Sequence, residues 1–397
     1  MGAGKAGNVT RLRRRDAAWL CVVAAATMLL ARPLAAGDDR RLALLLDAQA
    51  AFTKVELAPA PALADASACV QTQAAALSVA LPAEESDLQF RQGYCQLALA
   101  AVTRAPAAFA DAAAELDRAG IAMLAWLARR AGQIAAPPAW DLSAPCPQPC
   151  QALLPTANLW LGWLAWRAGN RDAAAARFSA NPGSGWSAYA AAVGAFDAGR
   201  YPEAAARYGE TLDVWTRGQN LANPPLALRL APPVDIPQLL TDLGGAQILA
   251  GQPAAAVPTL DRALESAQTA RAYFLRARAK ELSGQPEAAL ADYNLATRAA
   301  FADATGAASG EAHLYRGILY YRRKDYLRAE DEFSSALSFE IPPALRPDAS
   351  AWRHLSAVAS GSCGASRQFL EQSLATVSPY FPKAEAQALA AACRATP

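Results

Sequence analysis

Small and large apolar residues recur at fixed offsets between Glu311 and Pro342, on both sides of a short polar segment around Lys324. Counted from Gly317, the offsets are 3, 12, 16 and 19 residues, for Tyr320, Ala329, Phe333 and Ala336. Positions that share one face of a helix recur every three or four residues. The pattern therefore predicts two amphipathic helices joined by a tight turn, with Pro342 closing the unit.

The same frame occurs four more times upstream. Each unit has a small residue on its first helix, a turn residue, and then a small and a large residue on its second helix. In chain order these four positions are Gly162, Gly169, Ala174 and Phe178; Ala192, Gly199, Ala204 and Tyr208; Gly244, Gly251, Ala256 and Leu260; and Ala277, Gly284, Ala289 and Tyr293. Small residues let two antiparallel helices approach closely, and large ones fill the space between neighbouring hairpins.

This frame resembles the tetratricopeptide repeat (TPR) family, whose 34-residue unit has small residues and aromatics at these positions. The resemblance implies an all-α fold, a right-handed superhelical solenoid of helical hairpins. The sequence also departs from the family pattern. Between Gly169 and Lys324, the intervals between successive turn residues are 30, 52, 33 and 40 residues. The longest interval contains five prolines between Asn220 and Pro237, which cannot continue a helix.

The organisation that we expect has a helical N-terminal region of degenerate repeats, a Pro- and Cys-containing loop, the repeat array, and capping helices in which Phe369 replaces a small residue. The N-terminal helices should cover Leu42–Phe52, Leu63–Leu81, Leu88–Val102, Ala107–Arg118 and Ile121–Ala131. Leucines of the inserted loop should pack on the array: Leu221, Leu226, Leu228 and Leu230. The boundaries are 1–36 for a signal peptide, 37–131, 132–152, 153–345 with an inserted loop at 218–237, and 346–397.

The N-terminal segment has the layout of a secretory signal. Five Lys/Arg precede a 14-residue apolar run from Ala17 to Leu30, and small residues follow up to Gly37. The run is short for a membrane span. We expect cleavage near Ala36 and a chain that is exported to the periplasm or the cell envelope, with no membrane span after cleavage. A retained N-terminal anchor is the alternative.

Charge argues against a nucleic-acid partner once this segment is removed. The whole chain carries a formal net charge of +2, and the segment to Ala36 contains six Lys/Arg and one Asp, which leaves −3 for the remainder. A basic surface that would attract nucleic acid or an anionic membrane is therefore not indicated. The oligomeric state is left open.

The six cysteines after the signal suggest disulfide bonds, because an even number in an exported chain is typical of them. Cys69 and Cys95 lie symmetrically about Pro82, and Cys363 and Cys393 about the Ser378–Pro379 turn. Residues equidistant from a turn face each other across a hairpin. This predicts Cys69–Cys95 and Cys363–Cys393, and leaves Cys146–Cys150. Metal binding and thiol redox chemistry are the alternatives for Cys146 and Cys150.

No enzymatic motif is present. The sequence contains no nucleophile elbow, metalloprotease helix or phosphate-binding loop, and its two histidines, His313 and His354, fall in helical repeat positions. His313 is expected to pack. We therefore expect a protein that is not an enzyme, with no cofactor, no metal and no catalytic residue.

The resemblance implies that the first helix of each unit lines a binding groove. Carried over residue by residue, the main candidates for contact with a partner are Trp163, Trp166, Arg167, Trp186, Tyr189, Phe274, Arg278, Tyr321 and Arg322. Further groove positions on the same helices are Leu159, Val193, Phe196, Arg271, Glu281, Leu314 and Ile318. The Lys and Asn residues of the family's carboxylate clamp are missing at these positions. Several of the aromatics are alternatively core residues between repeats.

Two function hypotheses follow. The first is a periplasmic or envelope scaffold or adaptor that binds a protein or an extended peptide segment. The alternative is a protein that binds a glycan or lipid on the aromatic surface near Trp163 and Trp186, in an envelope or surface-polysaccharide assembly. Repeat architecture supports either only by analogy.

Overall fold

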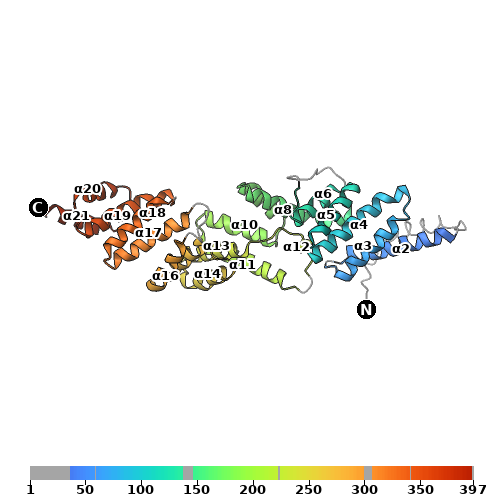
Figure 1. The fold of residues 1–397 in the computed structure, drawn as a ribbon, viewed down its shortest axis with the longest axis horizontal. Coiled ribbons are helices and arrows are strands. Elements are labelled where there is room, and N and C mark those ends of the chain that lie inside the picture. The colour runs from blue at the N-terminus through green and yellow to red at the C-terminus, as the bar shows by residue number, and fades with distance from the viewer. Residues whose placement is uncertain are drawn as a thin grey trace, which may run out of the picture. The chain divides into compact units, whose positions relative to one another are not determined.

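The computed structural model describes residues 36–58, 60–136, 146–221, 224–298, 306–339 and 341–395. Over these residues the regular secondary structure is helical, with no strand. The predicted all-α array of helical hairpins is confirmed (Figure 1). The expected signal peptide lies outside the described residues, apart from its last residue, Ala36.

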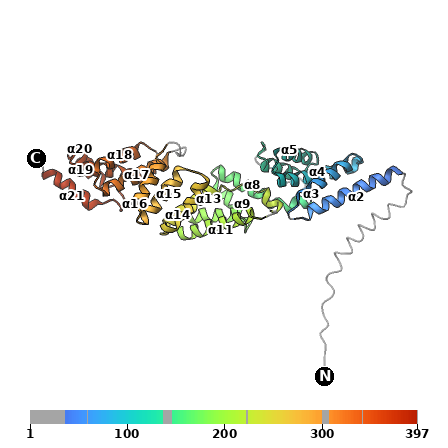
Figure 2. The same ribbon diagram turned by 60° about the horizontal axis from the view of Figure 1, so that its bottom comes forward.

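The chain divides into two compact units. The N-terminal unit comprises the residues up to Leu153 together with Pro225–Leu230, and the C-terminal unit comprises Leu154–Pro224 and Ala231–Pro397. In the C-terminal unit, consecutive helices pair and each pair packs against the next (Figures 1 and 2). The hairpins are α8–α9 (Leu154–Arg167, Arg171–Ser179), α10–α11 (Gly185–Asp197, Tyr201–Gln219), α13–α14 (Ile236–Leu249, Pro253–Ser266), α15–α16 (Ala270–Leu282, Pro286–Ala296), α17–α18 (Ala307–Arg322, Tyr326–Ser338) and α19–α20 (Arg346–Ala359, Gly364–Ser373). A short 3₁₀ turn, η2 (Pro343–Leu345), precedes α19, and α21 (Lys383–Ala395) ends the unit.

The turn of each hairpin uses one residue in the left-handed backbone region. Its φ is between +73° and +79° at Gly169, Gly199, Gly251 and Gly284. Glycine adopts this conformation without steric cost. In α17–α18 the same position is Lys324, with φ +62°, so this hairpin closes its turn with a residue that rarely adopts the conformation.

The close approach of paired helices explains the small residues of the frame. A Cβ atom on Gly162 would lie 2.6 Å from the Phe178 ring, and one on Gly317 would lie 2.8 Å from the Phe333 ring. Both phenylalanines are fully buried. The large residue of the second helix thus fills the volume left by the missing side chain on the first, 16 positions earlier.

The N-terminal unit is also helical. It contains α2 (Ala36–Glu56), α3 (Leu63–Leu77), α4 (Pro82–Thr103), α5 (Pro106–Arg118), α6 (Ala122–Ala131), α7 (Gln148–Ala152) and α12 (Leu226–Arg229). The expected helices of this region are present, but α3 ends at Leu77 and Leu81 is the N-cap of α4. The reason is Pro82, which is favourable in the first turn of a helix and ends the preceding one.

Two expected loops contain helices. The segment 132–152 includes α7. Pro147 is the N-cap of this helix, and Pro149 and Cys150 lie within it. The inserted loop 218–237 is shorter than expected, since α11 extends to Gln219 and α13 begins at Ile236, and it contains α12. Of its leucines, Leu226 and Leu230 are buried and belong to the N-terminal unit, where α12 packs on α4, whereas we expected them to belong to the array. Leu221 is exposed, so packing of this residue was wrongly expected.

The last hairpin corrects the frame of the capping region. Its left-handed turn residue is Gly361, so the small position of the second helix falls on Ser366 and the large position on Leu370, which is fully buried. Phe369 is therefore three residues after the small position that we expected it to occupy, and directly precedes the large position. Its ring stacks on His354, which replaces the small residue on the first helix, with 5.2 Å between the centroids.

The structure joins the cysteines in the three expected combinations. The Cα–Cα distances are 5.7 Å for Cys69 and Cys95, 5.4 Å for Cys146 and Cys150, and 5.5 Å for Cys363 and Cys393, all within the range of disulfides. The first links α3 to α4, and the last links the N-terminus of α20 to α21. Peptide mapping of the purified protein remains the chemical test of this pairing.

Candidate functional site

Three of the aromatic groove candidates are buried. Trp186, Phe274 and Tyr321 each expose about 5% of their surface. Trp186 stacks on Phe178 of the preceding hairpin, with 5.2 Å between centroids, and Tyr321 packs against Trp352 of the next. The hydroxyl of Tyr321 donates to Glu385. Their side chains fill the space between hairpins, which leaves little of them for a partner, and this corrects their assignment as contact residues.

Arg278 and Arg322 belong to an internal charge cluster around Glu281. Arg278 lies over the ring of Tyr315, 3.9 Å from its centroid, and its guanidinium is 2.5 Å from the Glu281 carboxylate. The hydroxyl of Tyr293 donates to the same oxygen at 2.8 Å, and Arg322 reaches the other oxygen at 3.0 Å. Arg278 is largely buried, so it stabilises the junction of α15 with α17, whereas Arg322 remains exposed.

The remaining candidates lie on or beside α8 and α10. Trp163 is partly exposed and contacts Trp160 edge-to-face at 5.2 Å. Exposed Arg167 covers the Trp163 ring at 4.9 Å. Trp166 and Tyr189 are also partly exposed, and both line a cavity of about 410 Å³ in the C-terminal unit.

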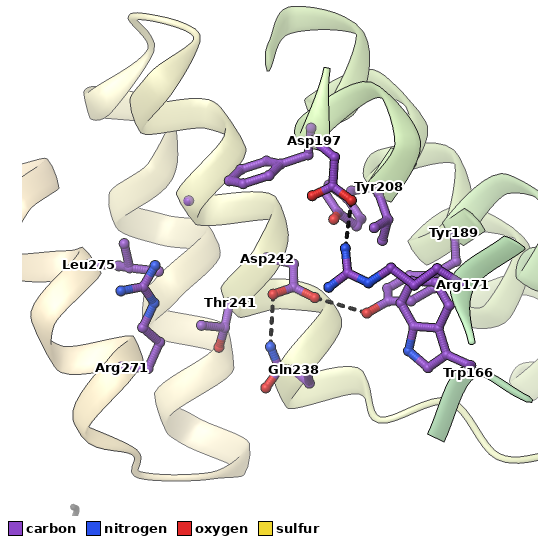
Figure 3. A pocket seen from close by; sticks show the side chains of 13 residues that line it. Trp166, Arg171, Tyr189, Asp197, Tyr208, Gln238, Thr241, Asp242, Arg271 and Leu275 are labelled. Carbon is purple, nitrogen blue, oxygen red and sulfur yellow. Dashed lines mark hydrogen bonds and ion pairs between the residues drawn. The ribbon is translucent and has the colours of Figure 1, made fainter. Parts of the chain in front are cut away.

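This cavity is bounded by the first helices of four successive hairpins (Figure 3). The residues from α8, α10, α13 and α15 are Trp166, Tyr189, Val193, Phe196, Asp197, Gln238, Thr241, Asp242, Gly245, Arg271 and Leu275. Arg171 of α9 and Tyr208 of α11 complete the lining. Of the groove positions implied by the repeat frame, the cavity thus brings together Trp166, Tyr189, Val193, Phe196 and Arg271.

One wall of the cavity is aromatic. Tyr189 contacts Trp166 at 5.5 Å and Tyr208 at 5.7 Å between centroids, in edge-to-face geometry. Arg171 lies over the Trp166 ring at 5.5 Å and forms an ion pair with Asp197 at 2.5 Å (Figure 3). The wall therefore presents electron-rich ring faces beside a cation that its own carboxylate already neutralises.

Asp242 is the polar centre of the cavity. Its Oδ2 accepts the Tyr189 hydroxyl at 3.0 Å, and its Oδ1 accepts the side-chain amide of Gln238 at 2.7 Å (Figure 3). Burial raises the pKa of the Asp242 carboxyl above its ordinary value, and these two hydrogen bonds and the charge of Arg271 only partly oppose it. The same burial, together with the charge of Asp242, raises the pKa of Tyr189.

The residues from α13 were missed at the sequence level, although the frame could have identified most of them. With Gly244 as the small residue, Gln238, Thr241 and Gly245 occupy the groove positions of α13. Asp242 is two residues before Gly244. The equivalent positions in three other hairpins hold large packing residues, Trp160, Leu275 and Tyr315. An acidic residue at this position of α13 was therefore the feature of the sequence that could have indicated a functional role for Asp242.

Two negative findings apply to the described part of the chain. Within it, no helix is both long enough and apolar enough to cross a bilayer. Within it, too, no three His, Cys, Asp or Glu side chains gather in a way that could hold a metal ion.

Comparison with known proteins gives similarity to solved structures alone. No model of a protein family matches the sequence, and no curated protein matches it. Similar structures include YrrB, a TPR protein with an unusual peptide-binding site, at 17% identity and TM-score 0.34 over 46% of this chain and 85% of YrrB. MamA protein aligns at 16% identity and TM-score 0.35, over 48% of this chain and 89% of MamA. A tetratricopeptide repeat protein from Parabacteroides merdae aligns at 13% and 0.32, over 84% and 98%. These values are too low to indicate a partner or an activity.

Proposed function

We propose that this chain, an array of tetratricopeptide-type helical hairpins, is an exported scaffold or adaptor that binds an extended segment of a partner protein. The binding surface is the face formed by the first helices α8, α10, α13 and α15. Binding there holds a partner in place and performs no reaction.

The observation that carries this proposal is the cavity shared by these four helices. Hairpin arrays leave a continuous surface that spans several repeats and suits an extended ligand. Aromatic and arginine side chains, which dominate binding energy at protein interfaces, gather at this surface as Trp166, Phe196 and Arg271. Elsewhere on the same face, buried aromatics such as Phe274 of α15 and Tyr321 of α17 fill the space between hairpins.

Export rests on the N-terminal sequence. A basic segment, a 14-residue apolar run and small residues up to Gly37 are the features of a secretory signal. Three disulfide pairs among the described cysteines suit an oxidising compartment such as the periplasm or the cell envelope.

One preparation tests both parts. The full chain is produced with its own leader in a bacterial host and purified from the periplasmic fraction, and its N-terminus is sequenced, with Gly37 or a close neighbour expected. Short unstructured peptides are then selected on it from a displayed library, and their affinities are measured by calorimetry for the wild type and for Trp166→Ala. We expect the substitution to weaken binding about 30-fold, the equivalent of about 2 kcal/mol.

The matched control is Tyr380→Ala, since Tyr380 is an aromatic that is 95% exposed and lies on no wall of the cavity. Melting curves separate lost binding from lost folding. A Trp166→Ala protein that melts normally and binds peptides as tightly as the wild type would contradict the proposed surface. If no peptide is selected while oligosaccharides or lipids change the tryptophan fluorescence, the glycan or lipid alternative replaces the peptide.

A further inference from the structure

Of the four charged side chains that line the cavity between α8, α10, α13 and α15, Asp242 alone has no ion-pair partner among the described residues. Arg171 is paired with Asp197 at 2.5 Å, and Arg271 is paired with Glu311 of the following hairpin at 2.9 Å. Asp242 has two hydrogen bonds from neutral groups, and none of the described residues forms an ion pair with it. When Glu311 is counted with the lining, these five charged side chains leave one unpaired negative charge, on Asp242.

The position of Asp242 makes this surplus costly. It occupies a packing position of the repeat frame, and a carboxylate there loses much of its hydration, which the charge of Arg271, already paired with Glu311, only partly offsets. The raised pKa of Asp242 has the same origin. A ligand that brings a positive charge to Asp242 recovers part of this cost, which a neutral or negative ligand cannot do.

The walls around Asp242 fit a cation on an apolar stem. Tyr189, Tyr208 and Trp166 turn aromatic surface toward the cavity, and ring faces attract cations. Val193, Phe196 and Leu275 supply apolar lining beside them. The volume of about 410 Å³ lies toward the lower end of the range of roughly 300–1,000 Å³ that ligand pockets occupy, which suits a single side chain.

We infer that this cavity is a specificity pocket for one lysine side chain of the bound partner segment, with Asp242 as the counter-charge of its ε-ammonium. The inference rests on the proposed function and names the group that the surface recognises. Lysine suits the pocket better than arginine because each Asp242 oxygen already accepts one hydrogen bond. A guanidinium fork needs both oxygens along one edge, whereas a compact ammonium needs one.

Binding then depends on pH through Asp242. Its carboxyl faces Tyr189 of α10, Tyr208 of α11, Gln238 on its own helix, Asp235 at the start of that helix and Arg271 of α15, and the Arg171–Asp197 pair lies in the same cavity. Lysine stays protonated up to a pKa of about 10.4. Affinity therefore falls as the pH decreases through the raised pKa of Asp242, when the carboxyl becomes neutral.

The test uses three small probes on the full exported chain. Nα-acetyl-lysine methylamide carries the ammonium, the norleucine analogue replaces it by a methyl group, and the Nε-acetyl-lysine analogue keeps the length without the charge. Titrations followed by tryptophan fluorescence or NMR should show the lysine probe binding at least about tenfold more tightly than either analogue. Asp242→Asn should remove this preference. Asp213→Asn is the matched control, since Asp213 is exposed on α11 outside the cavity and should leave the preference unchanged.

Gln238→Lys is a second variant, whose expected effect on binding does not come from a loss of folding stability. Gln238 is exposed and already reaches Asp242 at 2.7 Å from one turn away, so a lysine at this position supplies the missing cation from within the chain. We expect normal melting, loss of lysine-probe binding at neutral pH, and a pKa of Asp242 that falls in NMR titration.

Equal binding of the lysine and norleucine probes, or tighter binding of a glutamate probe, would overturn the lysine pocket. So would a Gln238→Lys chain that keeps wild-type affinity for the lysine probe. Peptides that still bind the wild type and still lose affinity in Trp166→Ala would show in that case that the proposed scaffold function stands and the inference alone has failed. Loss of all peptide binding to the wild type would contradict the proposed function itself.

Discussion

The same contact between a small residue on the first helix and a large residue on the second occurs in hairpins of two lengths. The longer is α4–α5 of the N-terminal unit, and the shorter are the five hairpins from α8 to α18. In each of the five, the left-handed turn residue lies seven positions after the small residue of the first helix and nine before the large residue of the second, as in Gly162, Gly169 and Phe178. In α4–α5 the corresponding residues are Gly93, Arg104 and Leu116, with intervals of 11 and 12.

The added residues are close to one helical turn on each side, four before the turn residue and three after it. An extension of one turn returns each side chain to the same face, so the contact is preserved. A Cβ atom on Gly93 would lie 2.7 Å from the Leu116 side chain, as close as the equivalent contacts of the shorter hairpins. Degenerate repeats can therefore change length and keep their packing, provided that both helices lengthen by whole turns.

The largest expected effect concerns the cross-link that the N-terminal hairpins have and the hairpins from α8 to α18 do not. The double substitution Cys69→Ala and Cys95→Ala releases a link over 26 residues, which should destabilise the N-terminal unit by about 3–4 kcal/mol in the chain-entropy treatment. Hydrogen exchange of α3 and α4 measures this loss locally, without assuming that the two units unfold together.

Cys146→Ala with Cys150→Ala is the control for that experiment. Its link spans four residues, so the expected loss is smaller, about 2 kcal/mol. Equal losses from both double substitutions, or peptide mapping that joins Cys95 to Cys146, would show that the packing of α3 on α4 differs from the one described.

Intermediate effects on stability are expected when alanine replaces glycine at the small positions of the first helices. Gly93→Ala and Gly317→Ala place a methyl group against Leu116 and against Phe333, respectively, and should each cost about 1–3 kcal/mol through overpacking. Similar losses in thermal or denaturant unfolding would establish that the long and short hairpins share one contact. Gly194→Ala in α10, where a methyl group meets nothing within 4 Å, should instead stabilise by up to about 1 kcal/mol. A loss at Gly317 with none at Gly93 would break the equivalence.

The smallest effect is expected at the turn. Lys324 holds φ +62° in a position where four other hairpins have glycine, so Lys324→Gly should raise the free energy of unfolding by about 0.5–1 kcal/mol. Lys324→Ala is the control, because alanine retains the Cβ atom and the unfavourable conformation, and its stability should match the wild type. A gain from alanine equal to that from glycine would assign the effect to the side-chain charge instead of the backbone.

The sequence was sufficient for the hairpins because their determinants are local. Gly244, Gly251 and Leu260 fix a close approach, a turn and a filled volume within 16 residues, and such short-range patterns are visible in one chain. The sequence was less informative about which aromatic side chains are buried. Trp186 and Trp166 both fell on expected groove positions, but the indole of Trp186 donates to the Pro232 carbonyl in the inserted segment and is covered there.

Long-range placement explains the other errors. Leu226 and Leu230 are separated from α4 by more than a hundred residues of sequence, and nothing in their own segment indicated that they pack in the N-terminal unit. In the α13–α14 hairpin the repeat frame identifies the small residue Gly244 and the turn residue Gly251, but it gives no role to Asp242. Its partner Tyr189 lies 53 residues earlier, so their hydrogen bond could not be read from spacing.

The charge cluster around Glu281 has a consequence for how the array responds to ionic strength. Three ion pairs cross the junction between α15–α16 and α17–α18: Arg322 with Glu281, Arg271 with Glu311, and Arg323 with Glu287. The three arginines are exposed to solvent, so mobile ions screen these attractions, whereas the junction between α10 and α13 depends on apolar contact and on the hydrogen bond from the Tyr189 hydroxyl to Asp242. In a linear array, cooperativity is transmitted only through such nearest-neighbour terms. High salt should therefore uncouple α17–α21 from the preceding repeats first, dividing one melting transition into two.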